Sequence, residues 1–132
     1  FFADKFYGYD DAIYVSLRLI EILSNSSKSL KDMVKLIPQY CSTPELRFEC
    51  INDQKKFNIM NDLRNSLESK YSCSTIDGIK VFIENGWGLL RASNTQPVIV
   101  CRVEAKTVES LENIKKILSF NLSKHKGIKF EF

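Results

Sequence analysis

Residues 77–105 read DGIKVFIENGWGLLRASNTQPVIVCRVEA, and this stretch decides the fold. It holds three apolar runs, at residues 79–84, 87–91 and 97–105, separated by the pair Asn85-Gly86 and by a polar loop. An Asn-Gly pair between apolar runs is the strongest short-range signal for a β-hairpin, because a type I′ turn needs positive φ at both central residues. Strands joined by tight turns must be antiparallel. The stretch therefore predicts three meandering strands at the centre of an antiparallel sheet.

The segments on either side predict a further strand and two helices. Residues 44–51 alternate between apolar and charged side chains, which is the pattern of a half-buried strand. Residues 54–70 and 107–122 carry apolar side chains at helical spacing, with Asp53 and Thr107 as the expected N-caps. The expected inward side chains are Phe57, Met60, Leu63 and Leu67 in the first helix, and Leu111, Ile114, Ile117 and Leu118 in the second.

These elements together predict the fold class. Residues 128–132 alternate again, so we expect a mostly antiparallel sheet of four to five strands. The clean alternation implies that two helices cover one face of the sheet and that the other face is open. Residues 42–132 are thus expected to form a two-layer α+β domain.

The N-terminal segment has a different pattern. Residues 11–23 predict a helix, with Asp10 or Asp11 as its N-cap. The helix is apolar almost all round, because after the cap only Arg18 and Glu21 are charged. A short helix at about residues 30–37 follows and ends before Pro38. Helices that are apolar all round belong inside larger structures. We therefore expect this helix to be the remnant of a larger structure, and the chain to be a fragment.

An apolar helix without partners is a liability for the protein that carries it. We expect helix 11–23 to cover its surface by self-association of the chain, or by non-native packing on the second domain.

Composition excludes several classes of protein. Lys and Arg number 19 and Asp and Glu number 16, so the net charge is only +3, which argues against a dedicated nucleic-acid binder. No apolar run approaches the ~18 residues that span a membrane. The four cysteines have no CxxC spacing and the chain has one histidine, so we expect no metal site and four reduced thiols in a cytoplasmic protein.

The loop of residues 91–97, RASNTQP, carries the chemistry. Arg91 offers a planar fork that can bind a phosphate through two hydrogen bonds. Ser93 and Thr95 offer hydroxyl donors and Asn94 offers an amide. Main-chain N–H groups in such a turn can also converge on an anion. The residue types alone are equally those of an ordinary turn that follows an exposed strand-end arginine.

One more arginine belongs to this region. Arg102 lies on the outgoing strand and is placed to return to the same rim of the sheet. No acidic residue lies between positions 92 and 101 to cancel these two positive charges. The residue types alone favour an ordinary turn, and an anion site at this rim is the alternative.

Residues 86–97, GWGLLRASNTQP, resemble the C-terminal phosphate-binding loop of the α-D-phosphohexomutases, and most of all its phosphomannomutase/phosphoglucomutase branch. Residues 1–4 (FFAD) and 7–12 (YGYDDA) resemble the stretch that follows the sugar-recognition loop of that family. The resemblance covers the whole chain, which would be the last quarter to third of such an enzyme. It implies that residues 1–41 are the helical remnant of the third, α/β domain and that residues 42–132 form the fourth, with a fold like that of the TATA-binding protein.

The resemblance implies an intramolecular phosphotransferase of the isomerase class, which moves a phosphoryl group between C1 and C6 of a hexose. A phosphoserine in the first domain donates the group, Mg²⁺ in the second stabilises the transfer, and hexose 1,6-bisphosphate is the intermediate and activator. All three belong outside this chain, so we expect no catalytic residue and no metal ligand here, and no activity of the chain alone. The implied partners are the phosphosugar substrate and the N-terminal domains of the same protein.

By motif position, the resemblance gives a binding role to part of this chain. The residues that would hold the non-reacting phosphate are Arg91, Ser93, Asn94, Thr95 and, with a looser match, Arg102. Asn94 favours the phosphomannomutase/phosphoglucomutase branch, since the glucosamine, acetylglucosamine and phosphopentose branches usually carry Gly there. The loop that selects the sugar lies outside the chain, so the sequence indicates no hexose preference.

Two alternatives stay open. One is the phosphoglucosamine mutase-like branch of the same family. The other is a non-catalytic α+β binding module, either an interaction domain or an RNA-binding domain. An RNA-binding domain would present aromatic rings on the open sheet face, where Phe82 and Trp87 are the candidates.

Overall fold

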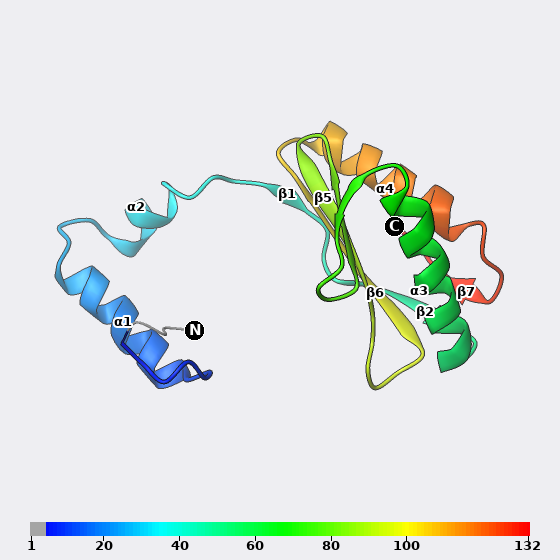
Figure 1. Cartoon of the computed structure of the whole chain (residues 1–132). Helices are drawn as coiled ribbons and strands as arrows, with labels where there is room; N and C mark the ends of the chain where they lie inside the picture. The colour runs from blue at the N-terminus through cyan, green and yellow to red at the C-terminus, as the bar shows by residue number, and fades with distance from the viewer. Residues whose placement is uncertain (1–4) are drawn as a thin grey trace. The chain divides into compact units, whose positions relative to one another are not determined.

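A computed structural model describes residues 5–132, and the chain divides into two compact units, Phe1–Pro38 and Gln39–Phe132 (Figure 1). The predicted boundary lay after residue 41. The structure places it earlier because β1 (Cys41–Ser42) pairs with β6 (Val98–Ala105), so Cys41 belongs to the sheet. The positions of the two units relative to one another are not determined.

The first unit contains two helices, as predicted. α1 (Ala12–Ser24) begins where the Asp11 side chain accepts a hydrogen bond from the Tyr14 N–H. α2 (Leu30–Val34) begins where Ser29 accepts a bond from the Asp32 N–H, and it is shorter than predicted. Neither helix has a buried residue. The cap residues thus define these helices, and packing contributes little.

The second unit is built on one sheet. Its other strands are β2 (Leu46–Cys50), β3 (Ser72–Ser74), β4 (Ile79–Ile83), β5 (Gly86–Ala92) and β7 (Ile128–Lys129). Within the described part of the chain the order is β3-β4-β5-β6-β2-β7, with β1 also on β6, and every pairing is antiparallel. The predicted antiparallel meander is confirmed, while the short strands β1 and β3 are additions.

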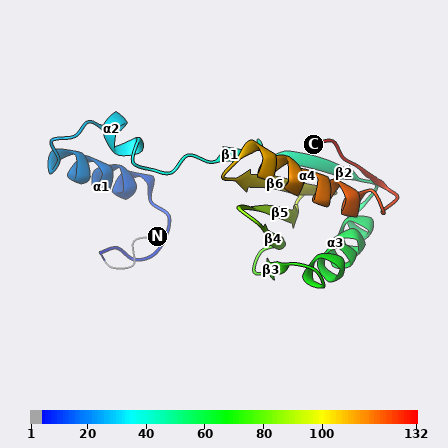
Figure 2. The same cartoon turned by 90° about the horizontal axis from the view of Figure 1, so that it is seen from above.

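Two helices, α3 (Asp53–Glu68) and α4 (Val108–Leu122), pack on the sheet and leave its other face open, which confirms the predicted two-layer α+β class (Figure 2). The strands contribute every second side chain to the core between the layers, since neighbouring side chains point to opposite faces. The fully buried side chains include Phe48, Ile59, Leu63, Val81, Leu90, Ile99, Cys101, Ile114 and Leu118.

The helices differ from the prediction in detail. In α3 the buried side chains are Lys56, Ile59, Leu63 and Leu67, whereas Phe57 is exposed, so the buried face is turned from the predicted one. Asn52 caps α3 in place of Asp53, because its side chain accepts the Lys55 N–H at 2.8 Å. Thr107 caps α4 as predicted. In α4, Ile114 and Leu118 are buried, and Leu111 and Ile117 are partly buried against the core.

The β4–β5 hairpin exists as predicted, but its turn is one residue earlier. Ile83 pairs with Gly86, so Glu84 and Asn85 form the turn, and Glu84 takes the positive φ of 47°. Gly86 lies in the strand, where a Cβ would come within 2.5 Å of the Glu104 carbonyl oxygen. Close packing therefore requires this glycine, whereas the prediction assigned it to the turn.

The four cysteines are all free, as predicted, and Cys50 and Cys101 are buried. Burial raises the pKa of the Cys101 thiol to about 12. Among the helices of residues 5–132, none is long and apolar enough to cross a membrane.

Candidate functional site

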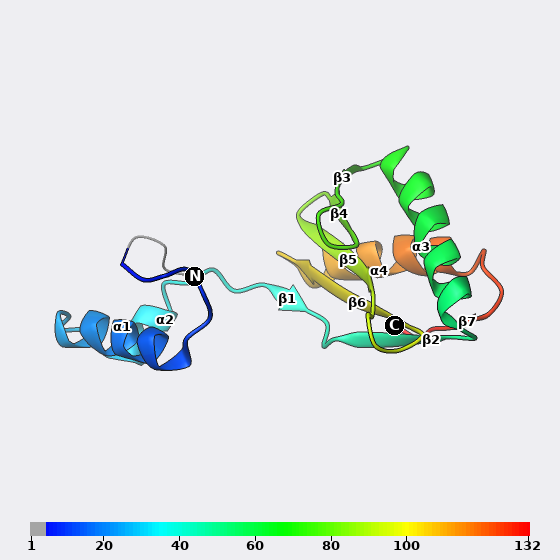
Figure 3. The same cartoon turned by 60° about the horizontal axis from the view of Figure 1, so that its bottom comes forward.

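The polar loop of residues 93–97 connects β5 to β6 near the start of α3 (Figure 3). Its ends are closed by the Ser93 N–H, which donates to the Val98 carbonyl at 2.9 Å, and by the Val98 N–H, which donates to the Gln96 carbonyl at 2.8 Å. The Cys50 N–H donates to the Pro97 carbonyl at 2.7 Å and holds the loop to β2. The loop is thus shaped by main-chain bonds at both ends.

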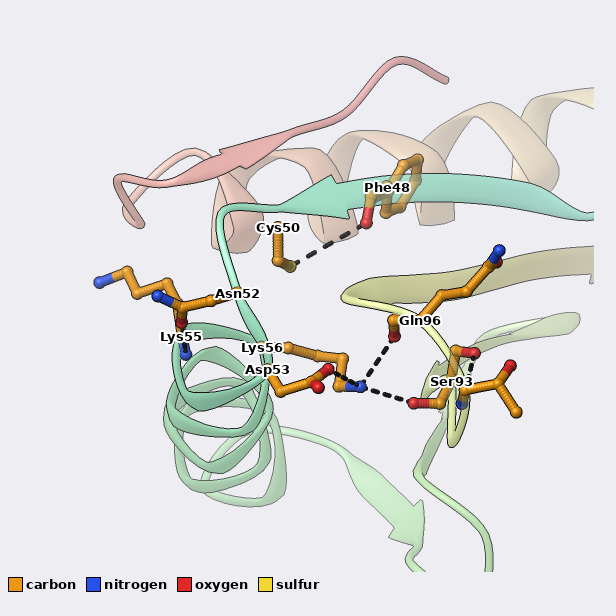
Figure 4. Close-up of polar contacts among 9 residues, drawn as sticks. Phe48, Cys50, Asn52, Asp53, Lys55, Lys56, Ser93 and Gln96 are labelled. Atoms are coloured by element: carbon orange, nitrogen blue, oxygen red, sulfur yellow. Dashed lines mark hydrogen bonds and ion pairs between the residues drawn. The ribbon is translucent and has the colours of Figure 1, made fainter.

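A buried lysine on α3, Lys56, contacts this loop (Figure 4). The Lys56 Nζ donates to the Ser93 carbonyl at 2.6 Å and to the Gln96 carbonyl at 2.8 Å. It also forms an ion pair with Asp53 at 2.7 Å. The side chain is only 1% exposed. Sequence analysis missed Lys56, because main-chain acceptors 37 and 40 residues away leave no pattern in the sequence.

Arg91 lies at the end of β5, beside the loop. Its side chain is 47% exposed, and its Nη1 forms an ion pair with Asp77 at 3.2 Å. A guanidinium group carries five N–H donors. Since this ion pair uses one nitrogen, most donors of Arg91 stay available to an anion.

Arg91 and Asn94 line one side of an open pocket of about 280 Å³. The pocket lies between the loop, the N-terminal end of β4 and one side of α3. Its other lining residues are Met60, Asn61, Arg64, Thr75, Asp77, Gly78, Ile79 and Ala92. Arg64 donates to Thr75 at 3.0 Å and pairs with Glu68 at 3.3 Å. The pocket therefore offers a small polar ligand two guanidinium groups, two side-chain amides and one hydroxyl group, beside the Asp77 carboxylate that pairs with Arg91.

The other predicted site residues lie outside the lining of this pocket. Ser93 and Thr95 share the loop with Asn94, and the Ser93 Oγ accepts the Thr95 N–H at 3.4 Å. Arg102 lies on β6 opposite Leu89, while Arg91 is opposite Val100. Arg102 therefore lies two residues farther along β6 from the loop than Val100, the residue opposite Arg91. Its side chain is on the open face of the sheet.

Arg47 reaches the loop from β2, and the sequence did not predict this contact. The Arg47 Nη2 donates to the Gln96 Oε1, and the Arg47 Nη1 pairs with Glu45 at 3.1 Å. Arg47 is one of the alternating charged positions of residues 44–51, for which the sequence predicts only a half-buried strand. Each cation near the loop thus has one carboxylate partner, namely Glu45, Asp53 or Asp77.

Over residues 5–132 there is no group of three or more His, Cys, Asp or Glu side chains that could hold a metal ion. What the arrangement offers an anion is hydrogen-bond donors, since Arg47, Lys56 and Arg91 are each already paired with a carboxylate.

Comparison with known proteins gives the context of this geometry. The family model for the phosphoglucomutase/phosphomannomutase C-terminal domain matches residues 45–119. A phosphomannomutase/phosphoglucomutase of Pseudomonas putida is 40% identical over 92% of this chain, which corresponds to 26% of that protein. A phosphoglucosamine mutase of Methanococcus maripaludis is 32% identical over 80% of this chain and 24% of that protein.

The fold is also found in a solved structure. The crystal structure of a phosphoglucomutase/phosphomannomutase family protein from Burkholderia thailandensis superposes with a TM-score of 0.82 at 32% sequence identity. The match covers 98% of this chain and 27% of that chain. The chain thus spans about a quarter of the length of the relatives that it matches.

Proposed function

The chain belongs to the phosphoglucomutase/phosphomannomutase family, and we propose that its unit of residues 39–132 binds a phosphate group of a hexose phosphate. The observation that carries this proposal is the position of Arg91 beside Asn94 at an open pocket, next to a loop that main-chain bonds hold in place. We include Ser93, Thr95 and Arg102 in the same role.

In a full-length phosphohexomutase of this family, the loop would hold the phosphate that does not react. Phosphoryl transfer depends mainly on positioning and on charge stabilisation. Binding of the remote phosphate orients the reacting end of the substrate and thereby lowers the activation free energy of phosphoryl transfer. A bisphosphosugar intermediate must bind in both orientations, so the loop must recognise phosphate and not one face of the sugar.

The phosphoserine and the Mg²⁺ of such an enzyme belong, in this proposal, to parts outside these 132 residues. We therefore propose that the chain alone lacks mutase activity. A rate above background with hexose 1-phosphate and a bisphosphate activator would contradict this.

The phosphomannomutase/phosphoglucomutase branch is favoured over the glucosamine branch. The Pseudomonas relative is 40% identical to this chain, and the Methanococcus phosphoglucosamine mutase is 32% identical. Asn94 in the loop supports the same choice. Rates of the corresponding full-length enzyme with mannose, glucose and glucosamine phosphates would decide between the branches.

The alternative of an RNA-binding module has a structural argument against it. The Lys80 ammonium lies 4.0 Å from the Trp87 ring centroid and 5.6 Å from that of Phe82. A base that stacked on either ring would have to displace this cation. The two aromatic side chains of the open face are thus already partnered.

The direct test is an amide NMR titration of this chain with mannose 6-phosphate and mannose 1-phosphate. One domain supplies only part of a cleft, so we expect a Kd on the order of 1 mM, which is about −4 kcal/mol. Shifts should centre on residues 91–95, be equal for both isomers and disappear in Arg91→Ala. Lys116→Ala, which removes an exposed charge on α4, is the control and should bind normally. Absence of shifts up to about 50 mM, well beyond that range, would refute the proposal.

A further inference from the structure

Lys56 is an unusual residue to find in a protein core. Lysine is almost never fully buried unless it is paired, yet this side chain is 1% exposed. An ammonium group has three N–H donors, and Lys56 has three acceptors within 2.6–2.8 Å. Only one acceptor is a carboxylate, that of Asp53, which is itself 66% exposed. The other two acceptors are carbonyl groups of the loop.

The two carbonyl groups flank the tip of the loop. Ser93 precedes Asn94, and Gln96 follows Thr95, so one ammonium group holds both sides of a two-residue tip (Figure 4). In a trans peptide the C=O and the following N–H point in opposite directions. Because the Ser93 C=O points to Lys56, the Asn94 N–H must point away from it.

The donors of the loop fit this description. Among the described residues, the main-chain N–H groups of Asn94 and Gln96 donate to no protein acceptor. The residue after Gln96 is Pro97, which has no main-chain N–H. The hydrogen bond from Lys56 to the Gln96 carbonyl therefore does not orient a second N–H group. Of the two residues at the tip, Asn94 therefore has the main-chain N–H that is available to a ligand, because the Thr95 N–H donates to Ser93 Oγ.

We propose that Lys56 is the positioning residue of the phosphate-binding loop, and this rests on the proposed function. Its ammonium group does not touch the ligand. It holds the Ser93 and Gln96 carbonyls inward, so that the Asn94 N–H faces the phosphate without reordering of the loop, and preorganisation of this kind raises affinity.

Phosphate affinity of the Lys56→Met variant tests this role. Methionine keeps the apolar stem and removes all three donors. We expect mannose 6-phosphate to bind at least tenfold more weakly, with amide shifts of residues 93–97 changed in the free protein. Lys55→Met is the matched control, because it removes the same charge at the neighbouring position. The described contacts of the Lys55 side chain include no hydrogen bond to the loop. It should bind within twofold of the wild type.

A second control separates the loop contacts from the ion pair. Asp53→Asn removes the counter-charge of Lys56 and leaves both carbonyl contacts in place. It should lose stability and keep its phosphate affinity. If Lys56 served only to stabilise the start of α3, Asp53→Asn and Lys56→Met would weaken binding to the same extent, and the proposal would be overturned.

Chemical rescue of phosphate affinity distinguishes the positioning role of Lys56 from a merely structural one. Lys56→Ala removes a fragment with the length of propylammonium. Added propylammonium should restore mannose 6-phosphate affinity in this variant and not in Arg91→Ala. The neutral 1-propanol should not restore it.

Loss of folding in the variants would be bypassed by a measurement on the wild-type chain. The Lys56 ammonium should give a slowly exchanging ¹⁵N signal with couplings across hydrogen bonds to the Ser93 and Gln96 carbonyl carbons. Absence of both couplings would overturn the proposal. If the wild type binds no phosphate, the proposed function fails as well; if it binds and Lys56→Met binds equally, only the role of Lys56 fails.

Discussion

Helices α1 and α4 have similar lengths, 13 and 15 residues, yet they are buried to very different extents. α1 is the more apolar of the two, but it has no buried residue, and Ile13 and Leu17 are 75% and 58% exposed. In α4, Ile114 and Leu118 are fully buried. The difference lies in what faces each helix. β5 has Gly88 where a Cβ would come within 2.7 Å of Leu118, so the sheet is shaped to receive α4.

The difference between α1 and α4 shows that a helix is not buried because of its apolar content alone. A helix gains free energy of folding only against a surface with complementary shape, since cores are close-packed. α4 has such a surface within its own unit, and α1 has none within residues 5–38. Stability of the chain should therefore depend almost entirely on residues 39–132.

The same substitution in the two helices gives the largest contrast. Leu118→Ala should destabilise the second unit by about 2–5 kcal/mol, because it leaves a cavity in the core. Leu17→Ala should change stability by less than about 0.5 kcal/mol, since the side chain is exposed. Urea unfolding followed by the fluorescence of Trp87, the only tryptophan, measures both. Equal effects would break the comparison.

The exposed face of α1 provides the next test. We propose that a second copy of the chain covers it, because Leu17, Ile20 and Ile22 are all more than half exposed. Leu17→Lys should weaken self-association at least tenfold, or about 1.4 kcal/mol. Sedimentation equilibrium at several concentrations measures this. A wild-type chain that stays monomeric at high concentration, with α1 ordered and exposed, would contradict the proposal.

The stability of the second unit should depend on pH in the alkaline range. Burial raises the pKa of Cys101 from 9.0 to about 12, so the thiol stabilises the fold fully below pH 9. This contribution is lost as the pH rises towards 12, because the unfolded chain then releases the proton first. Between about pH 8 and 10 the wild type should lose about 1 kcal/mol more stability than Cys101→Ala. Parallel pH profiles of the two proteins would show that the thiol is not buried.

The smallest effect is expected in the first unit at acidic pH. The ion pair with Lys35, then the hydrogen bond from Ser29, lowers the pKa of Asp32. A lowered pKa stabilises α2 above the ordinary value of 3.8 and ceases to do so as the pH falls through the lowered value. Because Asp32 is at the surface, the change in α2 helicity should be slight. Carbon chemical shifts of α2 measure it, and Asp32→Asn should remove the pH dependence.

Much of the second unit was predictable because its signals are local. The alternation of residues 44–51, the cap at Thr107 and the apolar runs of residues 79–105 each occupy one short stretch, and the structure contains the corresponding elements. β3 was not predicted, because Ser72–Ser74 is a short polar strand that exists only through its pairing with β4. The turn assignment of Gly86 was wrong because the requirement for glycine comes from Glu104, far along the chain.

The candidate site divides in the same way. Arg91 and the loop that follows it stand out by residue type and by resemblance, and the structure brings Arg91 and Asn94 to one pocket. Lys56 and Arg47 were not predicted, because a lysine in a helix and an arginine in an alternating strand ordinarily face solvent. Their partners, the carbonyl groups of the loop and the Gln96 side chain, are known only once the chain has folded.

The central claim is that residues 39–132 recognise phosphate by themselves. Titration of these residues alone with mannose 6-phosphate, followed by amide NMR and set beside the same titration of the whole chain, tests it most directly. We predict equal dissociation constants, with shifts centred on Arg91, Asn94 and Thr95 in both proteins. Loss of binding when residues 1–38 are removed, or shifts centred elsewhere on the sheet, would contradict the account.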